Sequence, residues 1–251
     1  MPKFKVLAKS TTLVTVSSLF CVILFNTVST ALLPNSNTKC KPSVFVISAP
    51  SGTGKTTLMN LLMQENKNIK KLVSVTTRAP RKTEKNGVDY KFISVKKYDR
   101  FLEKNAFFEA VESYGNKYGI LRSDVEELLN SGHDVILDLN YKGASEFVEN
   151  AKDKVNIVTI FIMPLSIAEL KRRLVSRGTD SAAVISDRMT QVMFQLNGYN
   201  EYDYIITDTT LESCLSSLDL IYKSFVLKRE SCKKGSDRML SIENEYGKIK
   251  K

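Results

Sequence analysis

Apolar positions after residue 41 follow two patterns, short continuous runs and spacings of three and four. The short runs predict β-strands at 44–48, 72–77, 91–95, 134–139, 155–162 and 204–207. The helical spacing predicts helices at 57–65, 96–104, 123–131, 144–152, 166–176, 181–195 and 211–227. Segments 107–113 and 117–120 alternate around Gly115-Asn116 and predict a hairpin. Ser123, with Glu126 three residues later, predicts a capping box.

The order of these elements predicts the fold class. Strands and helices alternate at both ends of the region, and a β-rich stretch lies between 72 and 121. Alternation of this kind is typical of a parallel sheet flanked by helices. We therefore predict an α/β core that carries a small inserted β subdomain.

The two ends of the chain differ from this core. No charged residue stands between Lys9 and Lys39, and the apolar part runs from 13 to 33. Three interpretations stay open for residues 1–40: a leader or membrane anchor, an organelle-targeting segment, and an extension that is not translated. Residues 229–251 form a charged tail, for which we expect a frayed helix or disorder.

Composition narrows the chemistry. The formal charge of +10 indicates anionic partners, and we favour small phosphates over nucleic acid because no basic helix or aromatic-basic repeat is visible. The single histidine, His133, follows Gly132 in an expected turn, so chemistry based on histidine is not expected. Cys21, Cys40, Cys214 and Cys232 are scattered, which predicts neither a zinc site nor a disulfide framework.

A glycine-rich segment after the first strand carries the strongest motif. Residues 48–57 read Ser-Ala-Pro-Ser-Gly-Thr-Gly-Lys-Thr-Thr, between a predicted strand and a predicted helix. Gly52 and Gly54 let backbone N–H groups turn toward a phosphate, Lys55 adds a cation, and the Thr56 hydroxyl suits Mg²⁺. Ala49 stands where the motif usually has its first glycine, which is tolerable if its φ is negative. The alternative without a function is a glycine-containing turn with a solvated lysine.

A second polar cluster lies in the β-rich stretch. Arg78 and Arg81 present guanidinium groups that match phosphate oxygens, and Ser74, Tyr90 and Tyr118 add hydroxyls. The alternative is a solvated basic loop with core tyrosines.

Two carboxylates complete the predicted sites. Glu109 lies among apolar residues, where a carboxylate needs a partner, and guanine offers its N1–H and 2-amino groups. The alternative is a strand residue whose carboxylate faces water. Asp138 ends an apolar strand, where a P-loop protein places a carboxylate near Mg²⁺ and its waters.

A third cluster is rich in arginine. Arg173 and Arg177 are four residues apart on one helix face, and Arg188 follows. Arginines on a mobile flap can close over phosphates and stabilise the charge of a transferring phosphoryl group. The alternative is a solvated helix face.

Taken in order, these motifs resemble the guanylate kinase family over roughly residues 43–227. The resemblance implies a P-loop NTPase core at 41–73, 124–172 and 189–228, a GMP-binding insert at 74–123 of mixed β structure, and a helical lid at 173–188. It also implies Mg²⁺-dependent transfer of the ATP γ-phosphoryl group to GMP.

The resemblance assigns roles by position. Lys55, Arg177 and Arg188 would be catalytic, and Thr56 would hold Mg²⁺ with Asp138 nearby. GMP would contact Ser74, Arg78, Arg81, Tyr90, Glu109, Tyr118 and Asp138. ATP would contact Ala49, Pro50, Ser51, Gly52, Thr53, Gly54, Lys55, Thr56 and Thr57.

The chain departs from the family pattern at three places. Ile120 replaces a hydroxyl residue, Asn140 replaces an aspartate, and Thr207-Asp208 replaces Asn-Asp. We expect weaker guanine contacts with Glu109 still dominant, because one neutral hydrogen bond contributes about 0.5–1.5 kcal/mol.

Other functions remain to be separated. A non-catalytic guanylate-kinase-like interaction module tends to have an eroded P-loop, and a GTPase needs an Asn-Lys-x-Asp segment that we do not find. The sequence of the insert between Ser74 and Glu109 argues against a different nucleoside monophosphate kinase. We expect a cytoplasmic monomer or homodimer, with membrane attachment or organelle targeting left open by the leader.

Overall fold

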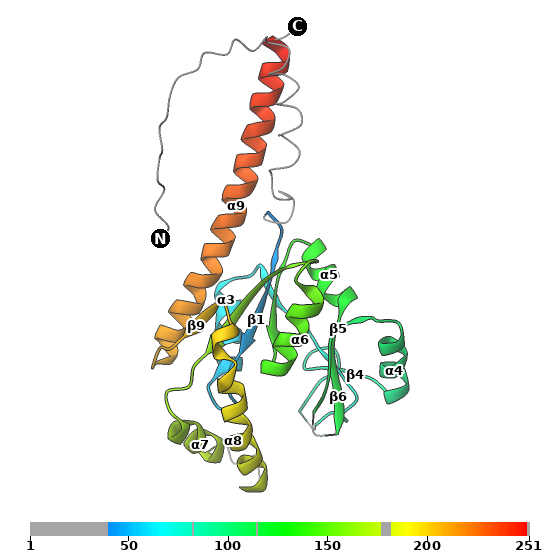
Figure 1. Ribbon diagram of the computed structural model, residues 1–251, viewed down its shortest axis with the longest axis vertical. Helices are drawn as coiled ribbons and strands as arrows, with labels where there is room; N and C mark the ends of the chain where they lie inside the picture. Colours follow the sequence, from blue (N-terminus) through cyan, green and yellow to red (C-terminus); the bar gives the residue numbers. More distant parts are fainter. Residues whose placement is uncertain (1–39, 82, 114, 177–181, 250–251) are drawn as a thin grey trace, which may run out of the picture. The chain divides into compact units, whose positions relative to one another are not determined.

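The core of the fold is a sheet of five parallel strands, β1 (Ser43–Ser48), β2 (Ile69–Lys71), β7 (Asp134–Asp138), β8 (Asn156–Ile162) and β9 (Tyr204–Ile206). The structure is a computed structural model that describes residues 40–81, 83–113, 115–176 and 182–249. The strand order is β2-β7-β1-β8-β9, which places β1 at the centre (Figure 1). This confirms the predicted α/β class.

Helices cover both faces of this sheet. Phe45 and Ile47 of β1 face α3 (Lys55–Glu65) and α9 (Leu211–Ile249), whereas Val44 and Val46 face α5 (Arg122–Asn130) and α6 (Tyr141–Ala151). Every residue of β1 is buried, because neighbouring strands and helices enclose it on all sides. Helices α7 (Ile167–Ser176) and α8 (Ala182–Asn197) and the 3₁₀ turn Tyr199–Glu201 complete the core.

A second sheet forms the insert. Its strands are β3 (Val75–Thr76), β4 (Lys91–Phe92), β5 (Phe107–Ser113) and β6 (Asn116–Leu121), in the order β4-β3-β6-β5. β3 pairs parallel to β4, and the other two pairs are antiparallel, so the sheet is mixed as predicted. Helix α4 (Val95–Glu103) packs on it through a small core that contains Tyr98 and Phe107.

Two local predictions were wrong. The strand expected at 72–77 is shorter, since only Val75–Thr76 form β3, and the preceding strand β2 at Ile69–Lys71, which belongs to the other sheet, was not predicted. The capping box at Ser123 does not form, because α5 begins one residue earlier, after Leu121, and has no side-chain cap. Side-chain caps occur instead at Ser94 of α4 and Asn140 of α6.

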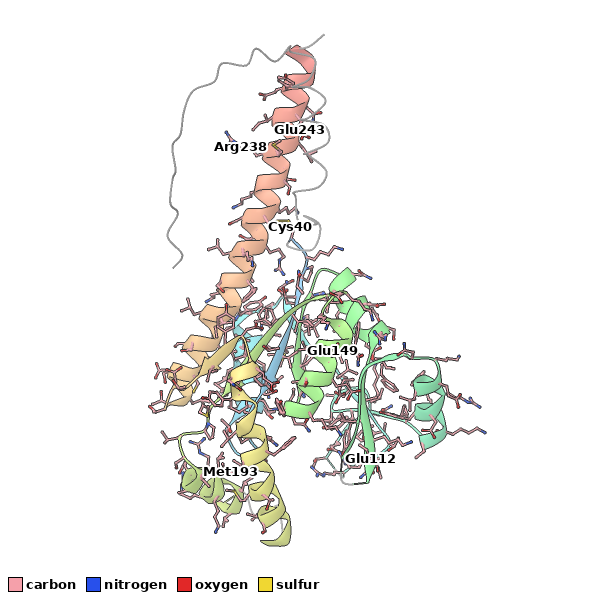
Figure 2. The ribbon with its side chains drawn as sticks, in the orientation of Figure 1. Cys40, Glu112, Glu149, Met193, Arg238 and Glu243 are labelled. Atoms are coloured by element: carbon pink, nitrogen blue, oxygen red, sulfur yellow. A yellow bond between two sulfur atoms is a disulfide. The ribbon has the colours of Figure 1, made fainter. Side chains whose placement is uncertain are left out.

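The cysteine prediction was also wrong. Cys40 and Cys232 form a disulfide with 5.6 Å between their Cα atoms, while Cys214 is free and buried. The two bonded cysteines are 192 positions apart, so no local spacing in the sequence indicates the bond. Packing brings them together: Cys40 precedes β1, and Cys232 lies on α9, which covers one face of that strand (Figure 2).

The closing helix does not end near Leu227 as expected, but continues to Ile249. Its first half packs on the core through Cys214, Leu218 and Tyr222, and residues from Lys233 to Tyr246 are exposed. Within the described ranges, which begin at residue 40, no helix is both long and apolar enough to cross a membrane. The apolar leader lies outside the described residues.

Candidate active site

The glycine-rich segment turns sharply between β1 and α3. Gly52 and Gly54 have φ angles of 95° and 101°, a left-handed conformation that glycine adopts without strain. Gly54 is the N-cap of α3, which directs the positive end of the helix dipole at the loop. Ala49 does not have a positive φ, since Asn105 is the only such non-glycine residue in the described ranges. The departure from the usual first glycine is therefore accommodated.

All nine residues predicted to bind ATP surround one cavity. Its volume is about 310 Å³, and Asp138, Asn140 and Gln195 complete its lining. Lys55 Nζ forms an ion pair with Asp138 Oδ1 inside it. The fold thus brings the P-loop lysine and the carboxylate at the end of β7 into contact, although 83 positions separate them.

Partial burial affects the charge of Lys55, whose side chain is 15% exposed. Desolvation lowers the pKa of its ammonium to about 7, and the charge of Lys71 acts in the same direction. Contact with Asp138 opposes this shift, because a carboxylate favours the charged form of the amine. A bound polyphosphate would act in the same way as the carboxylate.

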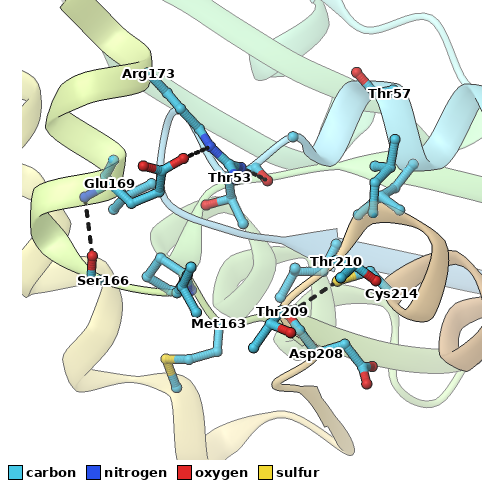
Figure 3. Close-up of a pocket in the computed structure, with 17 residues that line it drawn as sticks. Thr53, Thr57, Met163, Ser166, Glu169, Arg173, Asp208, Thr209, Thr210 and Cys214 are labelled. Atoms are coloured by element: carbon cyan, nitrogen blue, oxygen red, sulfur yellow. Dashed lines mark hydrogen bonds and ion pairs between the residues drawn. The ribbon is translucent and has the colours of Figure 1, made fainter.

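A second cavity of about 290 Å³ adjoins the P-loop on the side of Thr53 and Thr57 (Figure 3). Sequence reasoning did not identify most of its lining, which comes from the segments after β8 and β9. A usable signal existed, because ligands of parallel α/β sheets bind beyond the carboxyl ends of strands. The lining residues from these segments are Met163, Pro164, Leu165, Ser166, Asp208, Thr209, Thr210, Leu211 and Cys214.

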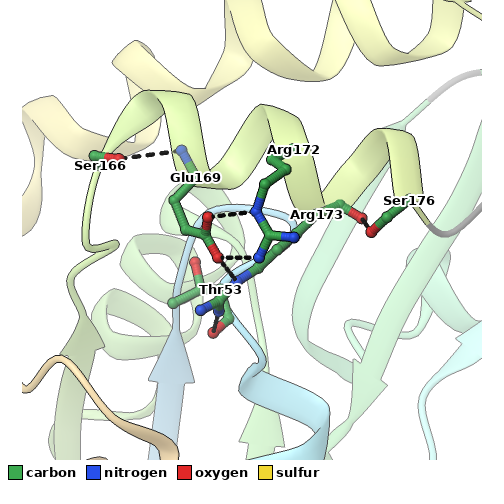
Figure 4. Close-up of polar contacts among 6 residues, drawn as sticks. All are labelled: Thr53, Ser166, Glu169, Arg172, Arg173 and Ser176. Atoms are coloured by element: carbon green, nitrogen blue, oxygen red, sulfur yellow. Dashed lines mark hydrogen bonds and ion pairs between the residues drawn. The ribbon is translucent and has the colours of Figure 1, made fainter.

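Arg173 lies at the boundary between this cavity and the P-loop. Its Nε donates to Glu169 Oε1 at 2.7 Å, and its Nη1 donates to the Thr53 carbonyl at 3.3 Å (Figure 4). Arg172 also binds Glu169, and the two guanidinium groups lower the pKa of that carboxyl to about 2. Glu169 therefore stays ionised and holds Arg173 against the phosphate-binding loop.

The remaining two predicted arginines are not placed. Arg177 lies outside the described residues, and so does the side chain of Arg188, which belongs to α8. Their proposed role in closing over phosphates stays a prediction.

The second polar cluster converges on Arg78. Its guanidinium carbon lies 5.5 Å from the centre of the Tyr90 ring, and Tyr90 meets Tyr118 edge-on at 5.9 Å. Glu84, which sequence reasoning missed, binds Arg78 Nη2 at 2.8 Å and accepts the Arg81 backbone N–H at 2.8 Å. The hydrogen bond to Glu84 is the main reason why the pKa of Arg78 is raised, with Tyr118 contributing.

Ser74 and Arg81 lie at the margin of this cluster. The Ser74 carbonyl accepts the Lys91 backbone N–H at 2.8 Å, which ties the start of β3 to β4. The Arg81 side chain is exposed and is held to the cluster through its backbone bond with Glu84.

Glu109 is buried, with 4% of its surface exposed. It pairs across the sheet with Ile120, which is fully buried, next to an irregularity between Phe107 and Glu109. Desolvation raises the pKa of the Glu109 carboxyl to about 8, and the negative charge of Glu146 adds to this. A carboxylate kept in such a setting suggests a ligand that supplies hydrogen-bond donors.

Asn140, one of the departures from the family pattern, has a structural role. Its side chain accepts the Gly143 N–H at 2.9 Å and so begins α6. It also lines the P-loop cavity beside Asp138.

Comparison with known proteins agrees with this geometry. A sequence model described as guanylate kinase matches residues 41–224. A guanylate kinase of Paramagnetospirillum magneticum is 38% identical over 74% of this chain and 86% of its own length. One from Shewanella denitrificans is 41% identical over 71% of this chain and 86% of its own. The crystal structure of guanylate kinase from Anaplasma phagocytophilum superimposes with a TM-score of 0.59 at 31% identity, covering 74% of this chain and 86% of that one.

Proposed function

The chain belongs to the guanylate kinase family, and from that premise we propose that it transfers the γ-phosphoryl group of ATP to GMP, giving ADP and GDP. The observation that carries the proposal is the P-loop cavity. Its nine predicted residues, Lys55 among them, line one space together with Asp138, and an eroded P-loop would lack these groups. A non-catalytic interaction module is therefore the weaker alternative.

ATP occupies the two adjoining cavities in this proposal. The polyphosphate lies in the P-loop cavity, where backbone N–H groups and the α3 dipole favour anions. The nucleoside extends into the cavity beyond Thr53, where Met163, Pro164 and Leu211 offer an apolar surface. Arg173, held by Glu169, lies between the two parts and faces the phosphates.

Mg²⁺ fits the residues present. Thr56 supplies a hydroxyl and Asp138 a carboxylate in the same cavity, and Mg²⁺ usually binds through one or two protein groups with waters and phosphate oxygens. When bound, the ion neutralises charge on the β- and γ-phosphates.

GMP binds to the insert. Arg78, Arg81, Tyr90 and Tyr118 hold its phosphate, with Ser74 at the edge of that group. Glu109 accepts the guanine N1–H and 2-amino hydrogens through its two carboxylate oxygens. Adenine has no N1–H, so the same carboxylate disfavours AMP. Ile120 supplies no hydroxyl to the base, and the pocket depends on Glu109 for its selectivity.

Catalysis then requires little beyond positioning. Phosphoryl transfer is accelerated by in-line alignment and by cations that stabilise charge on the transferring group. We assign Lys55 and Arg173 to the second task because both contact the P-loop region, and Arg177 and Arg188 by their position in the family.

A nucleotide-acceptor screen on a protein that starts near Lys41 tests the proposal. ADP release coupled to GMP, dGMP and AMP should show strong use of GMP and little use of AMP. Comparable turnover of AMP would refute the guanine assignment, and absence of turnover with every acceptor would favour the interaction module. GTP hydrolysis without GMP separates out a GTPase.

We further propose a cytoplasmic location, where both substrates are available. Disulfides such as Cys40–Cys232 are more usual in oxidising compartments. Differential alkylation of the native protein, read by mass spectrometry, discriminates the two cases. Free thiols at both positions agree with the cytoplasm, and a complete disulfide contradicts it. Sequencing of the native N-terminus would show the fate of the leader.

A further inference from the structure

Helix α6 of the core binds strand β5 of the insert on both sides of Glu109. Asn150 Nδ2 donates to the Phe108 carbonyl at 2.9 Å, and Glu146 Oε1 accepts the Ala110 N–H at 3.1 Å. Glu146 and Asn150 are four residues apart, so both lie on one face of α6. Because β5 is an edge strand of its sheet, these side chains supply bonds that a further strand would otherwise make.

The same face of α6 approaches the Glu109 side chain directly. A Cβ atom at Gly143 would lie 2.7 Å from Glu109 Oε1, closer than a real Cβ contact permits. Phe147, on the next turn, packs against Phe108 with ring centres 5.5 Å apart. Glu146 and Asn150 thus hold the backbone on either side of Glu109. The Glu109 carboxylate occupies the space that a side chain at position 143 would need.

The charges around Glu109 are unbalanced. Glu146 on α6 and Tyr98 on α4 are the titratable side chains that interact with it in the described ranges, and β6 contributes the apolar Ile120. The cations Arg122 and Lys154 lie over the neighbouring Phe108 ring, at 4.5 and 5.6 Å from its centre. Neither of these two side chains supplies a positive charge to the Glu109 carboxylate.

We propose that Glu146 is a positioning residue for the guanine site, which holds the β5 backbone beside Glu109 and places a second negative charge next to its carboxylate. The inference rests on the proposed role of Glu109. Its consequence is that Glu146 sets the pH at which the enzyme recognises GMP. Burial and Glu146 raise the pKa of Glu109 to about 8, so the free enzyme holds much of this carboxyl protonated at neutral pH. Only the ionised form accepts both guanine hydrogens.

The test is the pH dependence of KM for GMP from pH 6 to 8.5. In the wild type, KM should rise about tenfold per pH unit below the pKa of Glu109. Glu146→Gln keeps an oxygen acceptor for the Ala110 N–H and removes the charge. As the pH falls, KM for GMP of Glu146→Gln should begin to rise at a lower pH than in the wild type. At pH 7 this KM should be several-fold lower than that of the wild type. KM for ATP, measured in the same series, should not change.

Three further variants separate charge from structure. Glu149→Gln removes a carboxylate from the same helix that is exposed and forms an ion pair with Lys152, and its profile should match the wild type (Figure 2). Glu146→Ala loses the backbone bond as well, so its KM at pH 8.5 should exceed that of Glu146→Gln by several-fold. Gly143→Ala should raise KM for GMP through displacement of the Glu109 carboxylate, with the fold retained.

The outcomes are distinct. A Glu146→Gln profile that superimposes on the wild type, or a Glu146→Ala variant no weaker than Glu146→Gln, overturns the proposal. If Glu109→Gln leaves KM for GMP unchanged, the proposed guanine site itself is wrong. The titration of the Glu109 carboxyl carbon, followed by NMR in wild type and Glu146→Gln, gives an independent reading that should move to lower pH in the variant.

Discussion

The ATP side and the GMP side of the site are built from different material. On the ATP side, the part to which we assign the polyphosphate is mainly one continuous segment, the P-loop, and two glycines with positive φ fix its shape. The GMP side consists of side chains from the insert and from α6, oriented by the carboxylates of Glu84 and Glu146. The first geometry is a property of local sequence, while the second depends on tertiary packing.

This difference predicts where substitutions act. Changes in the P-loop should affect turnover with every acceptor, since they alter the phosphoryl donor. Changes in the insert should affect KM for GMP and the choice of acceptor, and spare KM for ATP. An insert variant that changes KM for ATP, or a P-loop variant that changes the choice of acceptor, would show that the two sides are coupled.

The largest effect is expected for Lys55→Met. The substitution removes the cation that contacts Asp138 in the P-loop cavity, and loss of one preorganised charged donor costs about 10²–10³-fold in kcat. Steady-state kinetics with GMP measures it, and circular dichroism should show an intact fold. Lys70→Met, at an exposed lysine of β2, is the matched control and should behave as wild type. Undiminished activity in Lys55→Met would discard the P-loop assignment.

Glu109→Gln should come next, on the GMP side. Charge-assisted hydrogen bonds contribute about 1.5–3 kcal/mol, so KM for GMP should rise roughly 10–100-fold while KM for ATP is unchanged. The preference for GMP over AMP should fall by a similar factor. Glu112→Gln, on the exposed end of β5, is the control (Figure 2). A preserved preference would show that another residue recognises guanine.

The same variant should be more stable at alkaline pH. An ordinary glutamate has a pKa near 4.5, and that of Glu109 is raised to about 8 in the fold. A raised carboxyl pKa means that the native state loses stability as pH rises from 4.5 to 8, and the full penalty is present above pH 8. Glu109→Gln removes it, so its melting temperature should exceed that of the wild type at pH 8.5 by more than at pH 5. Equal differences at both pH values would contradict this burial penalty.

The contrast between the two halves also explains what sequence can predict. The P-loop is predictable in full, because its residues are consecutive and each has a local conformational reason. Glu109 is recognisable because a carboxylate among Phe107, Phe108 and Val111 conflicts with its surroundings. Such a conflict between a residue and its neighbours is a reason, visible in the sequence alone, to propose a functional position.

Features that arise from tertiary contacts escape this reasoning. Glu84 was missed as well, although its partners Arg78 and Arg81 are only six and three positions away, because no helix or strand of the described ranges sets the spacing of this segment. The disulfide joins cysteines from opposite ends of the described chain, and α6 meets β5 only when core and insert are assembled. The run at 72–77 predicts a strand of which only Val75–Thr76 form, and β2 just before it was missed because Lys70 and Lys71 leave it without an apolar pattern.

A smaller effect is expected for Gly54→Ala, which examines the backbone contribution to ATP binding. A Cβ atom added at Gly54 would have nothing within 4 Å, so the cost is conformational, about 1–2 kcal/mol for a left-handed residue. KM for ATP should rise about tenfold, equivalent to ~1.4 kcal/mol. Gly132→Ala has the same open surroundings and a φ of 87° far from the P-loop in sequence, so it should lose similar stability without a change in KM. An equal KM for ATP in the two variants would show that the backbone conformation at Gly54 does not contribute to ATP binding.

The smallest effect is expected for Glu84, which binds the Arg78 guanidinium to which we assign the GMP phosphate. A partly exposed ion pair contributes about 0.2–1 kcal/mol, so Glu84→Ala should raise KM for GMP about 2–5-fold. Glu84→Gln keeps an acceptor for the Arg81 N–H and should lie between wild type and Glu84→Ala. Glu103→Ala, at an exposed position of α4, controls for loss of negative charge on the insert. If Glu84→Ala binds GMP more tightly instead, the carboxylate competes with the phosphate for Arg78, and the GMP side is held back by the same contacts that shape it.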